Sequence, residues 1–187
     1  MAVNEKLQII RHSCAHVMAE AILKIYPGTK IAIGPAIDNG FYYDFDFPTT
    51  TKFTETDFPA VEKEMRRIIA GNHDFVRKEV SKEEAIKLFA DQPYKVELIN
   101  DLPADAVITT YEQDGFMDLC RGPHVANTKE INGQAFKLEK VAGAYWRGDS
   151  SRPMLTRVYA VCFAKPNDLQ DYIKMMEEAE KRDHRKI

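Results

Sequence analysis

Residues 5–26 carry apolar side chains at the spacing of an α-helix. One stripe is formed by Leu7, Ile10, Cys14, Val17, Ala21 and Ile25, and further apolar residues widen it around most of the circumference. Asn4 suits the N-cap of this helix, and Pro27-Gly28 suits its end. Because a helix that is apolar on most sides is buried, the pattern predicts a central helix wrapped by other elements.

Two pairs of strand-like runs are separated by tight-turn sequences. Asn39-Gly40 lies between residues 30–37 and 41–47, and Asp114-Gly115 lies between residues 106–111 and 116–120. Both dipeptides favour β-hairpins, since glycine adopts positive φ at little cost. Alternation in the last of these runs predicts a polar face and an apolar face, formed by Phe116, Asp118 and Cys120 on one side and by Met117 and Leu119 on the other.

Helical and strand-like patterns alternate between residues 57 and 94, which predicts a small α/β lobe inserted between the hairpins. The other predicted elements are strands over residues 94–99, 136–141 and 155–163 and a last helix over residues 167–187. The chain is interpreted as one domain over residues 1–187. Its predicted fold class is α+β, an antiparallel sheet wrapped around a buried central helix.

Composition and charge describe an ordinary globular protein. The 187 residues are 44% hydrophobic and 29% charged, with a net charge of −3, which argues against nucleic-acid binding by bulk charge. The three cysteines are too few and too scattered for a disulfide framework. No run approaches membrane-spanning length, and the start lacks the apolar core of a signal peptide. These features predict a cytoplasmic protein without a membrane partner.

Two distant stretches carry the candidate chemistry. His12 and His16 are one helical turn apart, so their imidazoles share a face of the predicted helix. Cys120 and His124 follow far downstream, and Asp118 shares the strand face of Cys120. The four His and Cys side chains are good zinc ligands, and they are equally able to hold water and a polar substrate by hydrogen bonds. The alternative is that they are satisfied core residues; the complete set favours one shared site.

Two further segments contain candidate residues. Lys95, in the predicted strand 94–99, is by itself typical of a solvated surface charge. Trp146-Arg147, in a loop bounded by glycines, could stack on and clamp an RNA end, or could be a core aromatic beside a surface arginine.

Four motifs together resemble one family, the N-terminal editing domain of bacterial-type threonyl-tRNA synthetase. They are Arg11-His12-Ser13-Cys14-Ala15-His16, Ile33-Gly34-Pro35 through Asp38-Asn39-Gly40-Phe41-Tyr42-Tyr43-Asp44, Asp118-Leu119-Cys120-Arg121-Gly122-Pro123-His124, and Ala142-Gly143-Ala144-Tyr145-Trp146-Arg147-Gly148-Asp149. The alanyl-tRNA synthetase editing domain shares the His and Cys spacing, but the surrounding motifs match the threonyl family. The resemblance covers essentially the whole chain.

The resemblance implies post-transfer editing, the hydrolysis of serine esterified to threonine tRNA. It assigns the catalytic site to His12, Lys95, His16, Asp118, Cys120 and His124, and the binding of substrate or tRNA to Gly34, Tyr43, Arg121, Tyr145, Trp146 and Arg147. On this interpretation Lys95 and His12 position or activate water. His16 and His124 hold the terminal ribose or relay protons, Asp118 binds the seryl ammonium or hydroxyl, and Cys120 lines the pocket.

The resemblance also shapes the expectations for cofactors and partners. Alanyl-type relatives hold zinc at this pattern and the threonyl site is described as metal-free, so no metal is expected to be required; zinc at His12, His16, Cys120 and His124 is the alternative. The expected partners are the 3′ end of threonine tRNA and the rest of a synthetase, with no DNA. The aminoacylation domain, with its ATP and zinc sites, and the anticodon-binding domain are missing, so the chain is either an excised piece or a free-standing factor. A zinc-dependent alanyl-type deacylase and a non-catalytic tRNA-binding module are the competing hypotheses.

Overall fold

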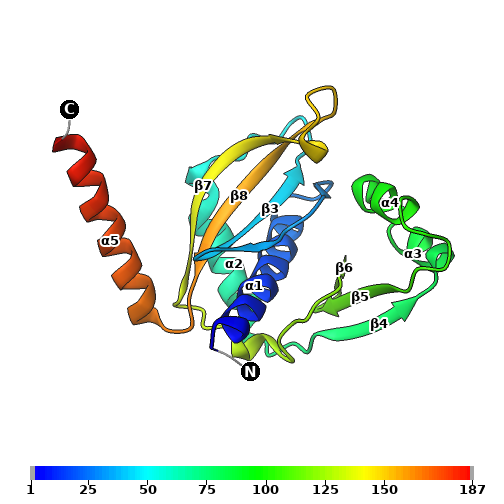
Figure 1. Cartoon of the computed structure of the whole chain (residues 1–187), viewed down its shortest axis with the longest axis horizontal. Helices are drawn as coiled ribbons and strands as arrows, with labels where there is room; N and C mark the ends of the chain where they lie inside the picture. The colour runs from blue at the N-terminus through cyan, green and yellow to red at the C-terminus, as the bar shows by residue number, and fades with distance from the viewer. Residues whose placement is uncertain (1–2, 186–187) are drawn as a thin grey trace.

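The computed structural model describes residues 3–185, which form two antiparallel sheets and five α-helices (Figure 1). The elements in order are α1 (Val3–Ile25), β1 (Lys30–Ile31), β2 (Ala36–Ile37), β3 (Gly40–Asp46), α2 (Phe58–Ala70), β4 (Val76–Val80), α3 (Lys82–Leu88), α4 (Pro93–Asn100), β5 (Ile108–Gln113), β6 (Phe116–Leu119), β7 (Phe136–Tyr145), β8 (Met154–Cys162) and α5 (Pro166–Arg185). The predicted α+β class is confirmed.

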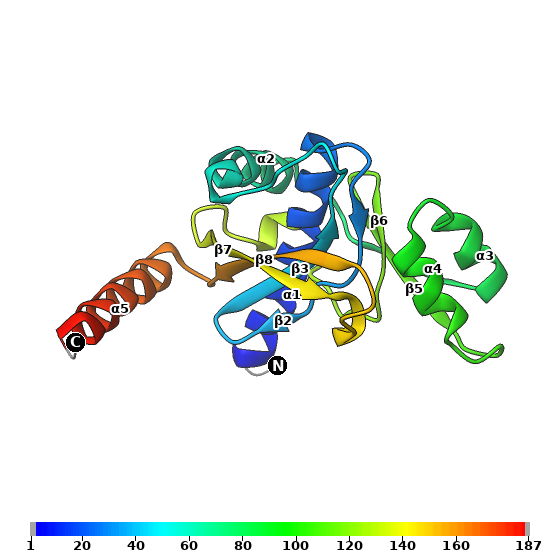
Figure 2. The same cartoon turned by 90° about the horizontal axis from the view of Figure 1, so that it is seen from above.

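The larger sheet has the strand order β1-β3-β8-β7, with β2 also paired to β3. Helices α1 and α2 lie on the same side of this sheet, so the main body has two layers (Figure 2). Phe41, Tyr43 and Phe45 of β3 point into the core between the layers and are almost fully buried. The aromatic face of β3 therefore covers the central helix.

Helix α1 is the centre of the core. Cys14, Val17, Met18 and Ile22 are all 0% exposed. The two predicted hairpins are also present, because Asn39 and Asp114 both adopt positive φ in the turns before β3 and β6. The elements that bring the two chemical motifs into the fold were thus predictable from local patterns.

The smaller sheet, ordered β4-β5-β6, carries α3 and α4 and forms a separate lobe beside the main body (Figure 1). Its extent differs from the expected 57–94. Helix α2 packs on α1, because Val61, Met65 and Ile68 belong to the main core. Conversely, β5 and β6 belong to the lobe through their pairing with β4.

The prediction of a strand over residues 94–99 is wrong, because this segment forms the helix α4. Pro93 occupies its first turn, where a fixed φ suits a helix and the missing N–H costs nothing. Tyr94 and Leu98, four residues apart, pack in a cluster with Trp146, whereas Val96 and Ile99 pack inside the lobe. The two faces of the helix therefore pack against different clusters. Apolar residues are needed on both faces, and this produces the alternation that suggested a strand.

Helix α5 runs from Pro166 to Arg185 and extends away from the sheet (Figure 1). Lys186 and Ile187, which the sequence interpretation included in this helix, lie outside the described residues. No helix within residues 3–185 is long and apolar enough to span a membrane.

Candidate active site

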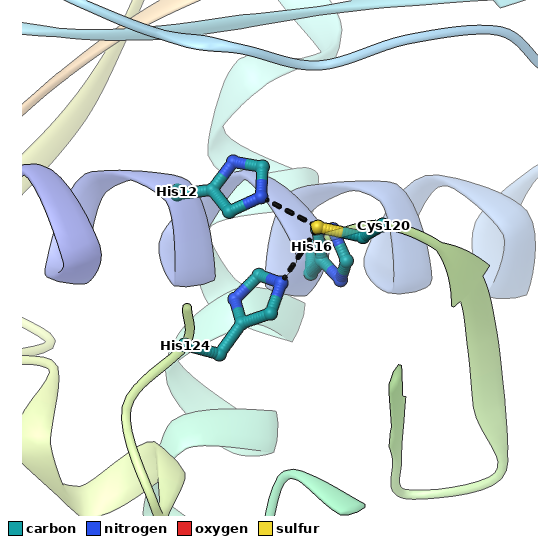
Figure 3. A group of neighbouring side chains, drawn as sticks. All are labelled: His12, His16, Cys120 and His124. Atoms are coloured by element: carbon teal, nitrogen blue, oxygen red, sulfur yellow. Dashed lines mark hydrogen bonds between the residues drawn. The ribbon is translucent and has the colours of Figure 1, made fainter. Parts of the chain in front are cut away.

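The two predicted chemical motifs meet in one place. His12 and His16 project from α1 toward Cys120 at the end of β6 and His124 in the following loop (Figure 3). One ligand-type atom from each of the four side chains lies within 4.8 Å of the others. The Sγ of Cys120 is 2.8 Å from Nε2 of His12 and 3.3 Å from Nε2 of His124. The predicted convergence of the helix and the strand is present.

Lys95 joins this cluster from α4, and it is a buried charge rather than a solvated one. Its Nζ lies 2.6 Å from Oδ1 of Asp118, and the two side chains are only 3% and 2% exposed. The hydroxyl of Tyr43 donates to Oδ2 of the same carboxylate at 2.6 Å. The ion pair therefore ties α4 of the lobe to β6 at the base of the site.

The oxygens of Asp118 are already occupied by neighbouring donors. Besides Lys95 and Tyr43, the backbone N–H of Leu119 donates to Oδ1 at 2.7 Å, and Nε2 of His16 lies 3.4 Å from Oδ2. This arrangement differs from the expected role, in which Asp118 binds a seryl ammonium or hydroxyl. Its geometry suits a carboxylate that holds Lys95, Tyr43 and His16 in place.

Burial sets the protonation states of the His and Cys side chains. Desolvation lowers the pKa of His12, His16 and His124, and in each case it is the largest cause. The pKa of the Cys120 thiol is raised to about 11, again chiefly by burial. At neutral pH the site therefore contains neutral imidazoles and a protonated thiol next to the Lys95–Asp118 pair.

A cavity of about 310 Å³ is lined by His12, His16, Ile33, Gly34, Pro35, Lys95, Asp118, Leu119, Cys120, Arg121 and Gly122. His124 does not line this cavity and reaches it only through its contact with Cys120. Glycine is required at position 34, because a Cβ there would lie 2.0 Å from Cδ2 of Tyr43. Tyr43 itself is buried under Gly34 and reaches the site through its hydroxyl. Of the expected binding residues, Gly34 and Arg121 line the cavity, and Tyr43 supports it from below.

The expected contribution of Trp146 to RNA stacking does not fit the structure. Its side chain is 2% exposed, packs against Tyr94 and donates its indole N–H to Glu97 at 2.7 Å. Arg147 forms ion pairs with Glu97 and Asp101. The ring therefore cannot stack on a nucleobase, and this turn instead fastens the β7–β8 hairpin to the helix that carries Lys95.

Tyr145, at the end of β7, is 41% exposed. It does not line the cavity. Its side chain is accessible to a partner, but the structure does not bring it together with the cluster of His12, His16, Cys120 and His124.

The donor set is compatible with zinc. Nδ1 of His16 is buried and has no hydrogen-bond partner, while Nε2 of His12 and Nε2 of His124 both face Sγ of Cys120. Three imidazoles and a thiol match the ligand chemistry of zinc. The four side chains could therefore hold a metal ion, and in its absence His12 and His124 both contact Sγ of Cys120.

The sequence interpretation missed Ser13, a fully buried residue between the two histidines of α1. Its Oγ lies 2.9 Å from Nδ1 of His124. A serine beside the apolar stripe of the helix was the available signal, because a buried hydroxyl requires hydrogen-bond partners.

Comparisons with known proteins show which family the chain resembles. Residues 108–159 match the family model described as the threonyl and alanyl tRNA synthetase second additional domain. The chain is 54% identical over 181 residues to a threonine–tRNA ligase of Dehalococcoides mccartyi, covering 97% of this chain and 30% of the relative. The corresponding ligase of Rhodopseudomonas palustris is 55% identical over 183 residues, covering 97% of this chain and 27% of the relative. The resemblance to the editing region of threonyl-tRNA synthetases is confirmed.

A third relative, the threonine–tRNA ligase of Enterococcus faecalis, is 54% identical over 184 residues, with 98% of this chain and 28% of the relative covered. The chain thus spans less than a third of the threonyl-tRNA synthetase relatives that it matches. The family model includes Asp118, Cys120 and His124 but begins after the histidines of α1. The similarity to the synthetases themselves extends over nearly the whole chain.

Proposed function

We propose that the chain hydrolyses the ester bond of seryl-tRNA(Thr), as the editing part of a threonyl-tRNA synthetase. The observation that carries this proposal is the meeting of Lys95, a buried cation, with neutral imidazoles at one cavity. Hydrolysis of an ester needs a proton acceptor for water and a positive group near the developing negative charge. The cavity offers both, and the similarity to threonine–tRNA ligases supplies the substrate class.

The physical need for such a site follows from the small difference between serine and threonine. One missing methyl group changes binding by only about 1–3 kcal/mol, which is too little for accurate translation. A second site that hydrolyses the serine ester raises the accuracy beyond what this difference in binding allows. The partners of the chain on this proposal are the 3′ end of threonine tRNA and the remaining domains of a synthetase, in the cytoplasm.

The residues divide into groups that face the substrate and groups that support them. Lys95 and His12 line the cavity, where the Lys95 ammonium positions water and the neutral imidazole of His12 receives its proton. Asp118 holds the Lys95 ammonium instead of binding the seryl group, because its oxygens are already occupied. Cys120 stays protonated and lines the pocket.

The test is deacylation of seryl-tRNA(Thr) and threonyl-tRNA(Thr) by the purified chain, with the His12→Ala variant beside it. We expect rapid loss of the seryl ester, little loss of the threonyl ester, and at least about a 100-fold lower rate for His12→Ala. Cys14→Ala is the matched control, because Cys14 is a buried residue of the same helix outside the site. Binding of the tRNA without hydrolysis would instead support a non-catalytic module.

Zinc-dependent hydrolysis of an alanyl-type ester is a second candidate, favoured by the unpartnered Nδ1 of His16. His12, His16, Cys120 and His124 would hold the ion. Bound zinc supplies Lewis-acid chemistry and lowers the pKa of a bound water. All four side chains together would make a closed site, whereas a catalytic zinc keeps one position open. Elemental analysis and deacylation of alanyl-tRNA with and without a chelator distinguish the two candidates.

A further inference from the structure

Ser13 uses its complete hydrogen-bonding capacity in the structure. Its hydroxyl donates to the carbonyl oxygen of Ile9, one turn earlier in α1, at 2.8 Å. The backbone N–H of Val125 donates to the same Oγ at 3.0 Å, and Nδ1 of His124 lies 2.9 Å away. A hydroxyl group has one proton to donate and two lone pairs to accept with. When the hydroxyl proton is directed to Ile9, Oγ is an acceptor toward His124.

This arrangement of donors and acceptors favours one tautomer of His124. An imidazole that donates through Nδ1 and is neutral carries its lone pair on Nε2. Nε2 of His124 lies 3.3 Å from Sγ of Cys120, which lines the cavity. The basic nitrogen of His124 therefore points toward the site, and its protonated nitrogen points toward α1.

Aromatic rings packed around His124 restrict the orientation of its imidazole, but they do not determine its tautomer. Its ring stacks on Phe75 at 5.2 Å between centroids and on His12 at 4.5 Å. Tyr111 contacts it edge-on at 4.5 Å. These rings limit tilting, but a turn of the ring in its own plane, or an exchange of the two nitrogens, is opposed only by a specific hydrogen bond. Ser13 supplies that bond.

We infer that Ser13 is a positioning residue, whose hydroxyl holds His124 with the proton on Nδ1 and the lone pair of Nε2 directed into the site. Its effect on rate rests on the proposed hydrolysis, in which the oriented ring of His124 supports Cys120 and His12 at the wall of the cavity. A purely structural role is the alternative: Ser13 would then only fasten the loop to α1 through the N–H of Val125.

Two measurements separate these roles. Long-range ¹H–¹⁵N spectra of the histidine rings report which nitrogen of His124 carries the proton, independently of any activity. Steady-state deacylation of seryl-tRNA(Thr) gives kcat and KM for Ser13→Ala, Ser13→Thr and Cys14→Ala. Cys14→Ala is a close control, because it also removes one γ atom from a fully buried residue of α1. Ser13→Thr retains a hydroxyl that can still bond the preceding turn.

We expect His124 of the unaltered chain to be protonated on Nδ1 alone at neutral pH. Ser13→Ala should lose this single tautomer and lower kcat about 10- to 100-fold, as supporting hydrogen bonds commonly do, with KM nearly unchanged. Ser13→Thr should restore the tautomer and most of kcat, and Cys14→Ala should change neither.

Three results would overturn the inference. The first is an Nε2–H tautomer in the unaltered chain, which can be read even if Ser13→Ala does not fold. The second is a single Nδ1–H tautomer that persists in folded Ser13→Ala. The third is a Ser13→Ala variant with unchanged kcat on a substrate that the unaltered chain hydrolyses. If the unaltered chain shows the Nδ1–H tautomer, loses it on Ser13→Ala, and hydrolyses no seryl-tRNA, the positioning role stands and the proposed function fails.

Discussion

The buried ion pair of Lys95 with Asp118 makes a quantitative prediction for Lys95→Met. Methionine keeps an unbranched apolar chain but removes the charge, which leaves the carboxylate of Asp118 at 2% exposure without its cation. Breaking a buried pair by removing one partner typically costs about 3–5 kcal/mol. The donors from Tyr43 and Leu119 remain, so we place the loss in unfolding free energy at the lower end, about 3 kcal/mol.

The double variant Lys95→Met/Asp118→Asn separates stability from chemistry. It removes both charges, and asparagine still offers an acceptor to the hydroxyl of Tyr43. Because replacing both members of a buried pair is often neutral, we expect it to regain about 2 kcal/mol of the loss. We expect neither variant to hydrolyse seryl-tRNA(Thr), since both lack the ammonium group at the cavity.

Urea unfolding followed by circular dichroism measures these changes. With a slope of about 2 kcal/mol per molar urea, the single variant should shift the midpoint down by about 1.5 M. Arg67→Met is the control, because its ion pair with Glu64 is exposed on α2 and its loss should leave the midpoint near that of the unaltered chain. Equal midpoints for Lys95→Met and Arg67→Met would refute the energetic reasoning, and hydrolysis by the double variant would refute the role of Lys95.

Three further predictions concern other parts of the fold. Trp146→Phe removes the indole donor to Glu97 and should lower the unfolding free energy by about 2 kcal/mol, measured in urea. Gly34→Ala should cost about 1–3 kcal/mol in the same assay and lower the rate of seryl-tRNA hydrolysis, because its Cβ would overlap the ring of Tyr43. The buried carboxyl of Glu20 has a pKa raised to about 8 from 4.5, mainly by desolvation. The folded state therefore binds more protons than the unfolded state between these values, so stability falls as pH rises through that window, and Glu20→Gln should remove up to about 1.4 kcal/mol per pH unit of that slope.

Each of these variants has a matched control. Tyr145→Phe alters an exposed aromatic next to Trp146 and should leave the urea midpoint unchanged. Gly133→Ala adds the same methyl where the nearest atom is 3.4 Å away, so it should be tolerated much better than Gly34→Ala. Glu178→Gln, on an exposed face of α5, should leave the pH slope of stability as it is. A control that changes as much as its paired variant contradicts the prediction.

Local patterns predicted the parts of the site that depend on one element at a time. The apolar stripe of α1 placed His12 and His16 on one turn, and Asp114-Gly115 positioned the strand that carries Asp118. The meeting of these elements was a hypothesis from residue types alone, and the structure brings them together because Phe116 of β6 and Val125 pack in the core around α1.

The remaining features depend on partners that are distant in the sequence. Residues 94–99 alternate in a way that fits a strand, and only packing against Trp146 on one side and the lobe on the other selects the helix. The burial of Trp146 likewise depends on Glu97, 49 positions earlier. The periodicity of α2 predicts an apolar face but does not say which part of the protein covers it. The sequence therefore could not assign α2 to the main body.

The electrostatic arrangement explains how neutral bases and a cation coexist in one small cavity. Lys95 alone would disfavour protonation of the imidazoles, and Asp118 alone would favour it, as the opposite directions in which the two charges shift the pKa of His12 show. Burial is the largest cause of the lowered pKa in all three histidines of the site. The cavity thus keeps His12 and His16 unprotonated while retaining an ammonium group beside them. A buried ion pair adds little to stability compared with apolar packing of the same volume. The arrangement therefore fits a chemical use of Lys95 in the cavity better than a purely structural one.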